Sequence, residues 1–181
     1  AVAITDHGTL SGVIEFYKSA KAKGIKPIVG MEAYVSARKH TDKSSAEDRN
    51  PYHLTLIAKN KAGYKNLMKL STIASLEGFY YKPRVDHDLL KKYSEGLIVL
   101  SGCLGGELGT MISNDQYEQA LQTAKWYRDT FGPDNYYLEL QPHIADFAEA
   151  GIALNRLEGR AQIVRGDLLQ SRAAPGPFDA R

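Results

Sequence analysis

The sequence lacks several features that define whole classes of proteins. A single cysteine in 181 residues excludes an internal disulfide framework. No apolar run approaches the ~20 residues that a membrane-spanning helix needs, and no signal-peptide pattern opens the chain. The formal net charge of +2 at pH 7 is too small to indicate nucleic-acid binding by itself. We therefore expect a cytoplasmic protein with no membrane partner.

The overall composition is that of an ordinary globular protein. Hydrophobic residues make up 43% of the chain and charged residues 24%, and the length suits one main domain. The chain opens at Ala1, in what reads as the middle of a strand, with no methionine or leader before it. We expect that an upstream part of the protein is missing.

Predicted strands and helices alternate along most of the chain. Apolar residues at helical spacing predict helices within residues 9–24, 61–78, 85–96 and 115–132. Apolar or β-branched runs predict strands within residues 1–5, 25–37, 53–60, 97–102 and 135–141. This alternation predicts an α/β fold with mainly parallel strands, either open or closed as a barrel. Functional side chains should then gather at the carboxyl ends of the strands.

Two segments depart from the alternation. Residues 38–51 carry almost no apolar side chain, so we expect an exposed and mobile loop there. From about Pro142 the alternation fades, and the end of the chain is rich in Arg, Ala, Gly and Pro. We therefore divide the chain into a domain over residues 1–143 and a divergent, poorly ordered tail over residues 144–181. A truncated or frame-disturbed gene end, or a foreign junction, is our hypothesis for this tail.

Four side chains that can bind a metal ion lie at or near the predicted strands. They are His7 in "TDHG", Glu32 in "GMEAY", His53 in "YHLTL" and Cys103 in "SGCLGG". These residue types suit zinc, manganese or iron, and the thiolate favours zinc. Each residue alone is more simply explained by a structural role. However, three of four successive strand units each supply one side chain of a type that binds metal. His53 fits least well, because it starts its predicted strand.

Other polar signals near these residues are weaker. Asp6 is either a further ligand or, as we favour, a carboxylate that orients the His7 ring. The glycines of "SGCLGG" match no phosphate-binding loop, and a tight turn explains them better. Tyrosines interleave the basic stretches "KSAKAKGIK", "KNKAGYKNLMK" and "YYKPR", as in single-strand nucleic-acid binders, although solvated helix faces explain them equally well.

Four longer strings carry a resemblance to a known family. They are "AITDHGTLSGVIEFYKSAKAKGIKPIVGMEAYV", "YHLTLIAKNKAGYKNLMKLS", "LEGFYYKPRVD" and "YSEGLIVLSGCLGGEL". Together they closely resemble the polymerase and histidinol phosphatase (PHP) domain that opens the alpha subunit of bacterial DNA polymerase III. The resemblance runs from Ala1 to about His143. The string "EGFYYKPR" followed by "SGCLGGE" is typical of the replicative polymerase, whereas small PHP phosphatases share mainly "TDH".

The resemblance implies a PHP-type distorted (βα)₇ barrel, here incomplete, with up to three divalent metal ions at one mouth. Its ligand set includes the positions of His7, Glu32, His53 and Cys103. Where the family's set is complete, the domain resembles metal-dependent phosphoesterases and can act as a 3′–5′ exonuclease. Where ligands are lost, it is thought to support the polymerase and a proofreading subunit. The implied partners are DNA, the proofreading subunit and the sliding clamp, all through the parent polymerase.

The sequence departs from the family pattern in two places. The upstream His-x-His element with its nearby acidic residue is absent, and so is the late Asp-x-His pair. Fewer than half of the family's ligand positions are therefore present, and the carboxylates that add nucleotides would lie far downstream. We predict that this fragment binds metal weakly and has no useful nuclease activity.

Two alternatives remain open from the sequence. The first is a free-standing phosphatase of the histidinol-phosphate type, which "EGFYYKPR" argues against. The second is a purely structural module that docks a proofreading or clamp-associated partner, and it is compatible with the same residues.

Overall fold

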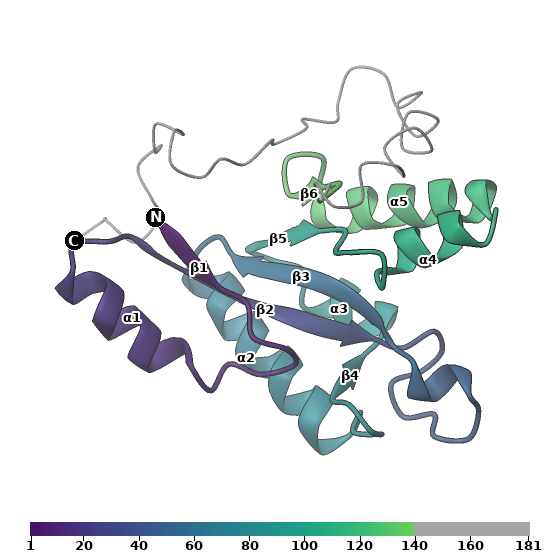
Figure 1. Ribbon diagram of the computed structural model, residues 1–181, viewed down its shortest axis with the longest axis horizontal. Helices are drawn as coiled ribbons and strands as arrows, with labels where there is room; N and C mark the ends of the chain where they lie inside the picture. The colour runs from purple at the N-terminus through teal and green to yellow at the C-terminus, as the bar shows by residue number, and fades with distance from the viewer. Residues whose placement is uncertain (140–181) are drawn as a thin grey trace.

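A mixed sheet of six strands forms the centre of residues 1–139, the part of the chain that the computed structural model describes (Figure 1). The main path of the sheet is β1 (Val2–Ile4), β2 (Pro27–Val35), β3 (Tyr52–Ala58), β5 (Leu97–Leu100) and β6 (Tyr136–Tyr137). The two-residue strand β4 (Arg84–Val85) pairs with the end of β2. The predicted tail over residues 144–181 lies outside the described residues.

Five α-helices of the described residues flank the sheet, and four of them confirm the predicted helices. They are α1 (Val13–Ala22), α2 (Lys61–Leu76), α3 (His87–Lys92), α4 (Glu107–Ser113) and α5 (Tyr117–Phe131). Side-chain caps fix two of the starts, because Asn60 accepts a hydrogen bond from the Gly63 N–H and Asp86 accepts one from the Leu89 N–H. The short helix α4 and the strand β4 were not predicted. Within residues 1–139, no helix has both the length and the apolar character needed to cross a membrane.

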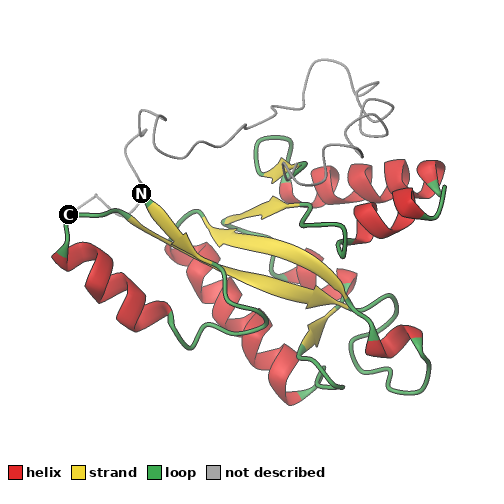
Figure 2. Cartoon of the chain, viewed as in Figure 1, coloured by secondary structure: helices red, strands yellow, loops and turns green. Residues whose placement is uncertain are grey.

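The six described strands are mainly parallel, as predicted, except that β3 runs opposite to the other five. It pairs antiparallel with β2 and with β5, whereas the β1–β2, β2–β4 and β5–β6 pairs are parallel. The physical reason is the connection from β2, which is a loop with one short 3₁₀ turn (Glu47–Arg49) instead of a crossover helix (Figure 2). The described strands form an open mixed sheet in an α/β fold, and they do not by themselves complete the implied (βα)₇ barrel.

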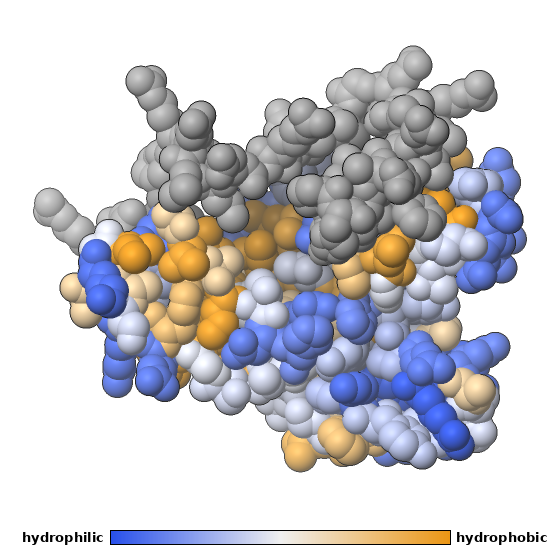
Figure 3. Space-filling view, viewed as in Figure 1, coloured by the Kyte–Doolittle hydropathy of each residue, from blue (hydrophilic) through white to orange (hydrophobic). Residues whose placement is uncertain are grey.

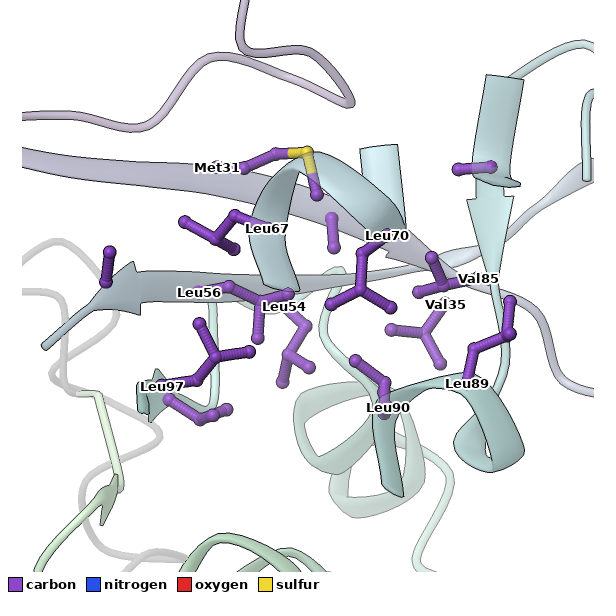
Figure 4. Packing of buried hydrophobic residues seen from close by; sticks show 14 of the residues in the cluster. Met31, Val35, Leu54, Leu56, Leu67, Leu70, Val85, Leu89, Leu90 and Leu97 are labelled. Carbon is purple, nitrogen blue, oxygen red and sulfur yellow. The ribbon is translucent and has the colours of Figure 1, made fainter. Parts of the chain in front are cut away.

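The main core lies between the sheet and α2. The β2–β3 register places Met31 opposite Leu56, and both side chains point to the same face. Leu67 and Leu70 of α2 pack onto that face and are fully buried (Figure 4). Full burial of one such side chain stabilises the fold by about 1.5–3 kcal/mol, so this layer fixes the register of the two strands.

The opposite face of the same strands carries the polar residues. Side chains alternate along a strand, so Glu32 and Tyr34 of β2 share this face with His53 and Thr55 of β3. The register pairs Tyr34 with His53 and Glu32 with Thr55. Two residues from the predicted site therefore become neighbours through the pairing that buries the core.

The loop between β2 and β3 is exposed over most of its length, as predicted, and hydrophilic side chains gather over it at the lower right of Figure 3. The predicted mobility of the loop stays a prediction, and Asp48, which is only 1% exposed, anchors the loop. Asp48 accepts hydrogen bonds from the Arg38 guanidinium at 2.6 Å and from the N–H groups of Ser44 and Ser45 at 2.9 Å. The bond from Arg38, supported by the two N–H groups, holds the pKa of Asp48 well below its usual range.

Arg84 ties this loop to the rest of the fold. Its side chain is completely buried and donates to the carbonyl oxygens of His40, Asp42 and Asp48 at 2.8–2.9 Å. It also donates to the Gly78 carbonyl oxygen at 3.0 Å, in the loop that follows α2. One guanidinium thus joins the loop after β2 to the loop after α2, and its burial lowers its pKa.

Candidate metal centre

Three of the four predicted ligands meet on the polar face of the sheet. One ligand atom from each of His7, Glu32 and His53 lies within 4.8 Å of the others. Glu32 Oε1 is 2.8 Å from His53 Nδ1, and Glu32 Oε2 is 3.5 Å from His7 Nε2. The carboxylate therefore lies between the two imidazoles and offers one oxygen to each.

His7 reaches the cluster because the chain after β1 continues alongside β2. The Gly8 N–H donates to the Glu32 carbonyl oxygen at 2.9 Å, and the Glu32 N–H donates to the Asp6 carbonyl oxygen at 3.1 Å. Gly8 has a positive φ of 66°, and a Cβ atom there would lie 2.6 Å from Pro83 Cγ. Glycine is needed at this position for both its conformation and its size.

His53 reaches the cluster because β3 is reversed. The first residues of an antiparallel strand lie beside the last residues of its partner, so His53 pairs with Tyr34 near the end of β2. The His53 N–H donates to the Gly105 carbonyl oxygen at 2.9 Å, which ties the strand to the turn after β5. Its place at the start of a strand, which fitted a parallel sheet poorly, is explained by this direction.

Cys103 lies beside the cluster without joining the group of three. Its Sγ atom is 3.8 Å from His53 Nδ1. The segment "SGCLGG" is a tight turn, as we favoured from the sequence, because the Gly106 N–H donates to the Cys103 carbonyl oxygen at 2.9 Å. The thiol is therefore held close to the same imidazole nitrogen that faces Glu32.

Tyr34 contacts His7 on the side away from Glu32. Its hydroxyl lies 3.0 Å from His7 Nδ1, and the tyrosine is buried. We predicted that Asp6 would orient His7, but the Asp6 carboxylate lies beside Gly12, where an added Cβ would be 2.8 Å from Oδ2. The orienting role of Asp6 stays a prediction. Tyr34 was missed, although its position two residues after Glu32 on a strand places both on one face.

The donors of the cluster suit a divalent metal ion. Imidazole nitrogens and carboxylate oxygens bind zinc, manganese and iron, and the neighbouring thiol favours zinc. The His7 side chain is 60% exposed and that of His53 is 31% exposed. The site is therefore most open to solvent on the side of His7.

A second histidine and glutamate cluster lies near the turn that carries Cys103. Glu107 Oε2 is 2.9 Å from His87 Nε2 and accepts a hydrogen bond from the Tyr127 hydroxyl at 2.9 Å. The His87 ring stacks on Trp126 with centroids 4.1 Å apart. Burial, together with the charge of Glu107, raises the pKa of Tyr127 well above its ordinary value. No pattern in the sequence predicted this cluster.

The fold and the open cluster agree with what a family comparison finds. The family described as "PHP domain" matches residues 1–143, and the chain belongs to that family.

Relatives narrow the family further. The DNA polymerase III subunit alpha of Borreliella burgdorferi is 52% identical over 143 residues, which cover 78% of this chain and 12% of the relative. The subunit of Treponema pallidum is 47% identical over 147 residues, with 81% and 13% covered. That of Aquifex aeolicus is 50% identical over 147 residues, with 78% and 13% covered. The chain therefore spans about an eighth of the length of these polymerase subunits.

Proposed function

We propose that the chain is the PHP-domain portion of a replicative DNA polymerase alpha subunit and that it holds divalent metal between His7, Glu32 and His53. The observation that carries the proposal is the approach of these three ligand atoms to within 4.8 Å of one another. Cys103 acts as a further ligand from its position beside His53. The similarity to named polymerase subunits supports a parent that performs DNA-directed DNA synthesis, with DNA, a proofreading subunit and the sliding clamp as its partners.

In the parent, the site would act as a metal-dependent phosphoesterase that removes nucleotides from a DNA 3′ end. Metal ions in such enzymes generate hydroxide and stabilise charge on the scissile phosphate. The residues of this chain supply the ligands and their orientation. The Tyr34 hydroxyl makes a hydrogen bond with Nδ1 of His7, so Nε2 of His7 faces Glu32. Glu32 spaces the two imidazoles by offering one oxygen to each.

The fragment itself should bind metal weakly and release no nucleotides. It carries fewer than half of the ligand positions that the family resemblance implies, and the His7 side chain is largely exposed. Weak binding is therefore compatible with a competent site in the parent.

The test is a calorimetric titration of zinc and of manganese into the 181-residue chain, its Glu32→Gln variant and a matched Glu95→Gln control. Glu95 is an exposed glutamate outside the cluster. We expect weak uptake by the wild type and the control, and none by Glu32→Gln. Equal uptake by all three proteins would refute the proposed ligand set.

The accompanying activity assay uses a single-stranded DNA 3′ end and, beside it, histidinol phosphate. Tight stoichiometric metal together with release of 3′ nucleotides would contradict the expected inactivity of the fragment. Hydrolysis of histidinol phosphate alone would favour the free-standing phosphatase. If Cys103→Ala and His53→Ala lose metal but keep partner binding in the parent, the catalytic role is favoured over a docking role.

A further inference from the structure

A loop with exposed aromatic rings borders the metal centre. It joins α2 to β4 (Figure 1). Phe79 is 56% exposed and Tyr81 is 63% exposed. Aromatic side chains contribute much of the contact energy at interfaces, and tyrosine is enriched there. We use the name aromatic platform for these two rings and the two cations beside them, Arg49 and Lys82.

The aromatic platform is connected to the cluster by direct contacts. Lys82 Nζ lies 5.4 Å from the centre of the Tyr34 ring, and the Tyr34 hydroxyl is 3.0 Å from His7 Nδ1. On the other side, Pro83 packs closely against Gly8, the residue after His7. A chain-like ligand lying on the platform can therefore extend into the metal centre.

The loop is held firmly, and its tip is strained. Arg84 donates to the Gly78 carbonyl oxygen at 3.0 Å, and the Tyr80 N–H donates to the Lys82 carbonyl oxygen at 3.0 Å. Tyr81 has a φ of 58°, in the left-handed region that a bulky side chain adopts at an energetic cost. Strain that is retained at an exposed aromatic residue points to a role in function.

The charges around the rings are suited to phosphate. The Arg49 guanidinium lies 5.5 Å from the centre of the Tyr81 ring, and both Arg49 and Lys82 are exposed. The nearby acid Glu77 is turned to His40, with Oε2 3.8 Å from Nε2. Exposed rings beside cations are the arrangement that binds single-stranded nucleic acid, because bases stack on the rings while the cations attract the backbone.

We infer that the aromatic platform stacks the terminal bases of a single DNA strand and leads its 3′ end to the metal centre. This inference rests on the proposed function, because it supplies the substrate path for that site. Single strands are favoured over duplex DNA, since bases inside a duplex are already stacked on each other.

The test measures binding of a fluorescein-labelled 12-nucleotide oligothymidylate to the 181-residue chain by anisotropy, in low salt with EDTA. The decisive variant is Tyr81→Gly, because glycine removes the ring and accepts the positive φ. We expect roughly tenfold weaker binding with an unchanged or raised melting temperature. Tyr81→Phe should bind nearly as the wild type does. Tyr117→Ala, which removes an exposed ring from α5, serves as the control and should also leave binding unchanged.

A salt series tests the role of the cations. Arg49→Ala and Lys82→Ala should each reduce the slope of log affinity against log salt by about 0.7. Unchanged binding by Tyr81→Gly, equal weakening by Tyr117→Ala, or equally tight binding of a 12-base-pair duplex would overturn the inference. Absence of DNA binding by the wild type would also overturn it and leave the platform to a protein partner. Because EDTA removes metal, failure of metal uptake in the separate titration would refute the proposed function without affecting this result.

Discussion

Two histidine and glutamate clusters lie in the described part of the chain, and their surroundings give them opposite properties. In the candidate metal centre, Glu32 lies between two imidazoles, and the His7 side chain is 60% exposed. In the second cluster, Glu107 is buried and both of its bonds, to His87 and to Tyr127, converge on one oxygen.

A close pair of histidine and glutamate is therefore not by itself a sign of a metal site. The second cluster is the more closed of the two, because Trp126 stacks on His87 and Tyr127 fills the core beside Glu107, although the His87 side chain is still 36% exposed. His87 and the Tyr127 hydroxyl both contact Oε2 of Glu107, which gives this buried oxygen two partners. The first cluster is the more exposed, so a metal ion can reach the lone pairs of His7 and Glu32. The two clusters differ most in the exposure of the carboxylate and of one imidazole. The Glu32 side chain is 22% exposed against 11% for Glu107, and the His7 side chain is 60% exposed against 36% for His87.

The largest effect should come from opening the closed cluster. Tyr127→Ala removes a fully buried ring and should lower the free energy of unfolding by about 3–5 kcal/mol. Tyr127→Phe keeps the ring but removes the hydrogen bond to Glu107, and should cost about 1–3 kcal/mol. Urea unfolding followed by circular dichroism measures both. Similar losses in the two variants would mean that the bond, and not the packing, carries the stability.

The next effect comes from a matched pair of glutamate substitutions. Glu32→Gln should lower the affinity for zinc roughly a hundredfold, with little change in the free energy of unfolding. This loss is about 3 kcal/mol, which is the contribution of one ligand to a structural zinc site. Glu107→Gln should lower the stability and leave zinc affinity unchanged. Calorimetric titration and urea unfolding of both variants test the contrast. The same response in both would remove the distinction between the clusters.

A smaller effect is expected at the thiol. Cys103→Ser should reduce zinc affinity roughly tenfold and manganese affinity less, because the thiolate is a soft ligand that favours zinc. Competition with a chromogenic chelator measures both metals. If both affinities remain at wild-type values, Cys103 is a structural neighbour of His53 and does not act as a ligand.

The smallest effect is the alkaline response of the closed cluster. Burial raises the pKa of Tyr127 above that of the unfolded chain, so the unfolded state ionises first as pH rises above about 10. The contribution of Tyr127 is therefore present below that pH and is lost above it. The stability advantage of the wild type over Tyr127→Phe should shrink by about 0.8 kcal/mol at pH 10.5 relative to pH 8. An advantage that stays constant in urea unfolding across this range would contradict the assignment.

The sequence patterns predicted the candidate metal ligands better than they predicted the direction of β3. His7 and Glu32 stood out because polar side chains interrupt apolar strands, and the structure brings them together. The direction of β3 was not predicted, because the alternation of side chains along a strand is the same whichever way the strand runs. His53 therefore seemed to lie at the wrong end of its strand. Glu107 contacts His87, which lies 20 residues before it, and Tyr127, which lies 20 residues after it. No local period links such positions, and the two-residue strand β4 is too short to show one.

The reversed strand β3 also sets an order in which the site can form during synthesis. Antiparallel pairing of β2 with β3 closes only the segment 36–51, and short loops cost little entropy to close. Glu32 and His53 can therefore meet before the ribosome has added Cys103, which lies 50 residues beyond His53. His7 depends on the three-residue edge strand β1. We expect Glu32 and His53 to be in place first, and His7 and Cys103 to join them later.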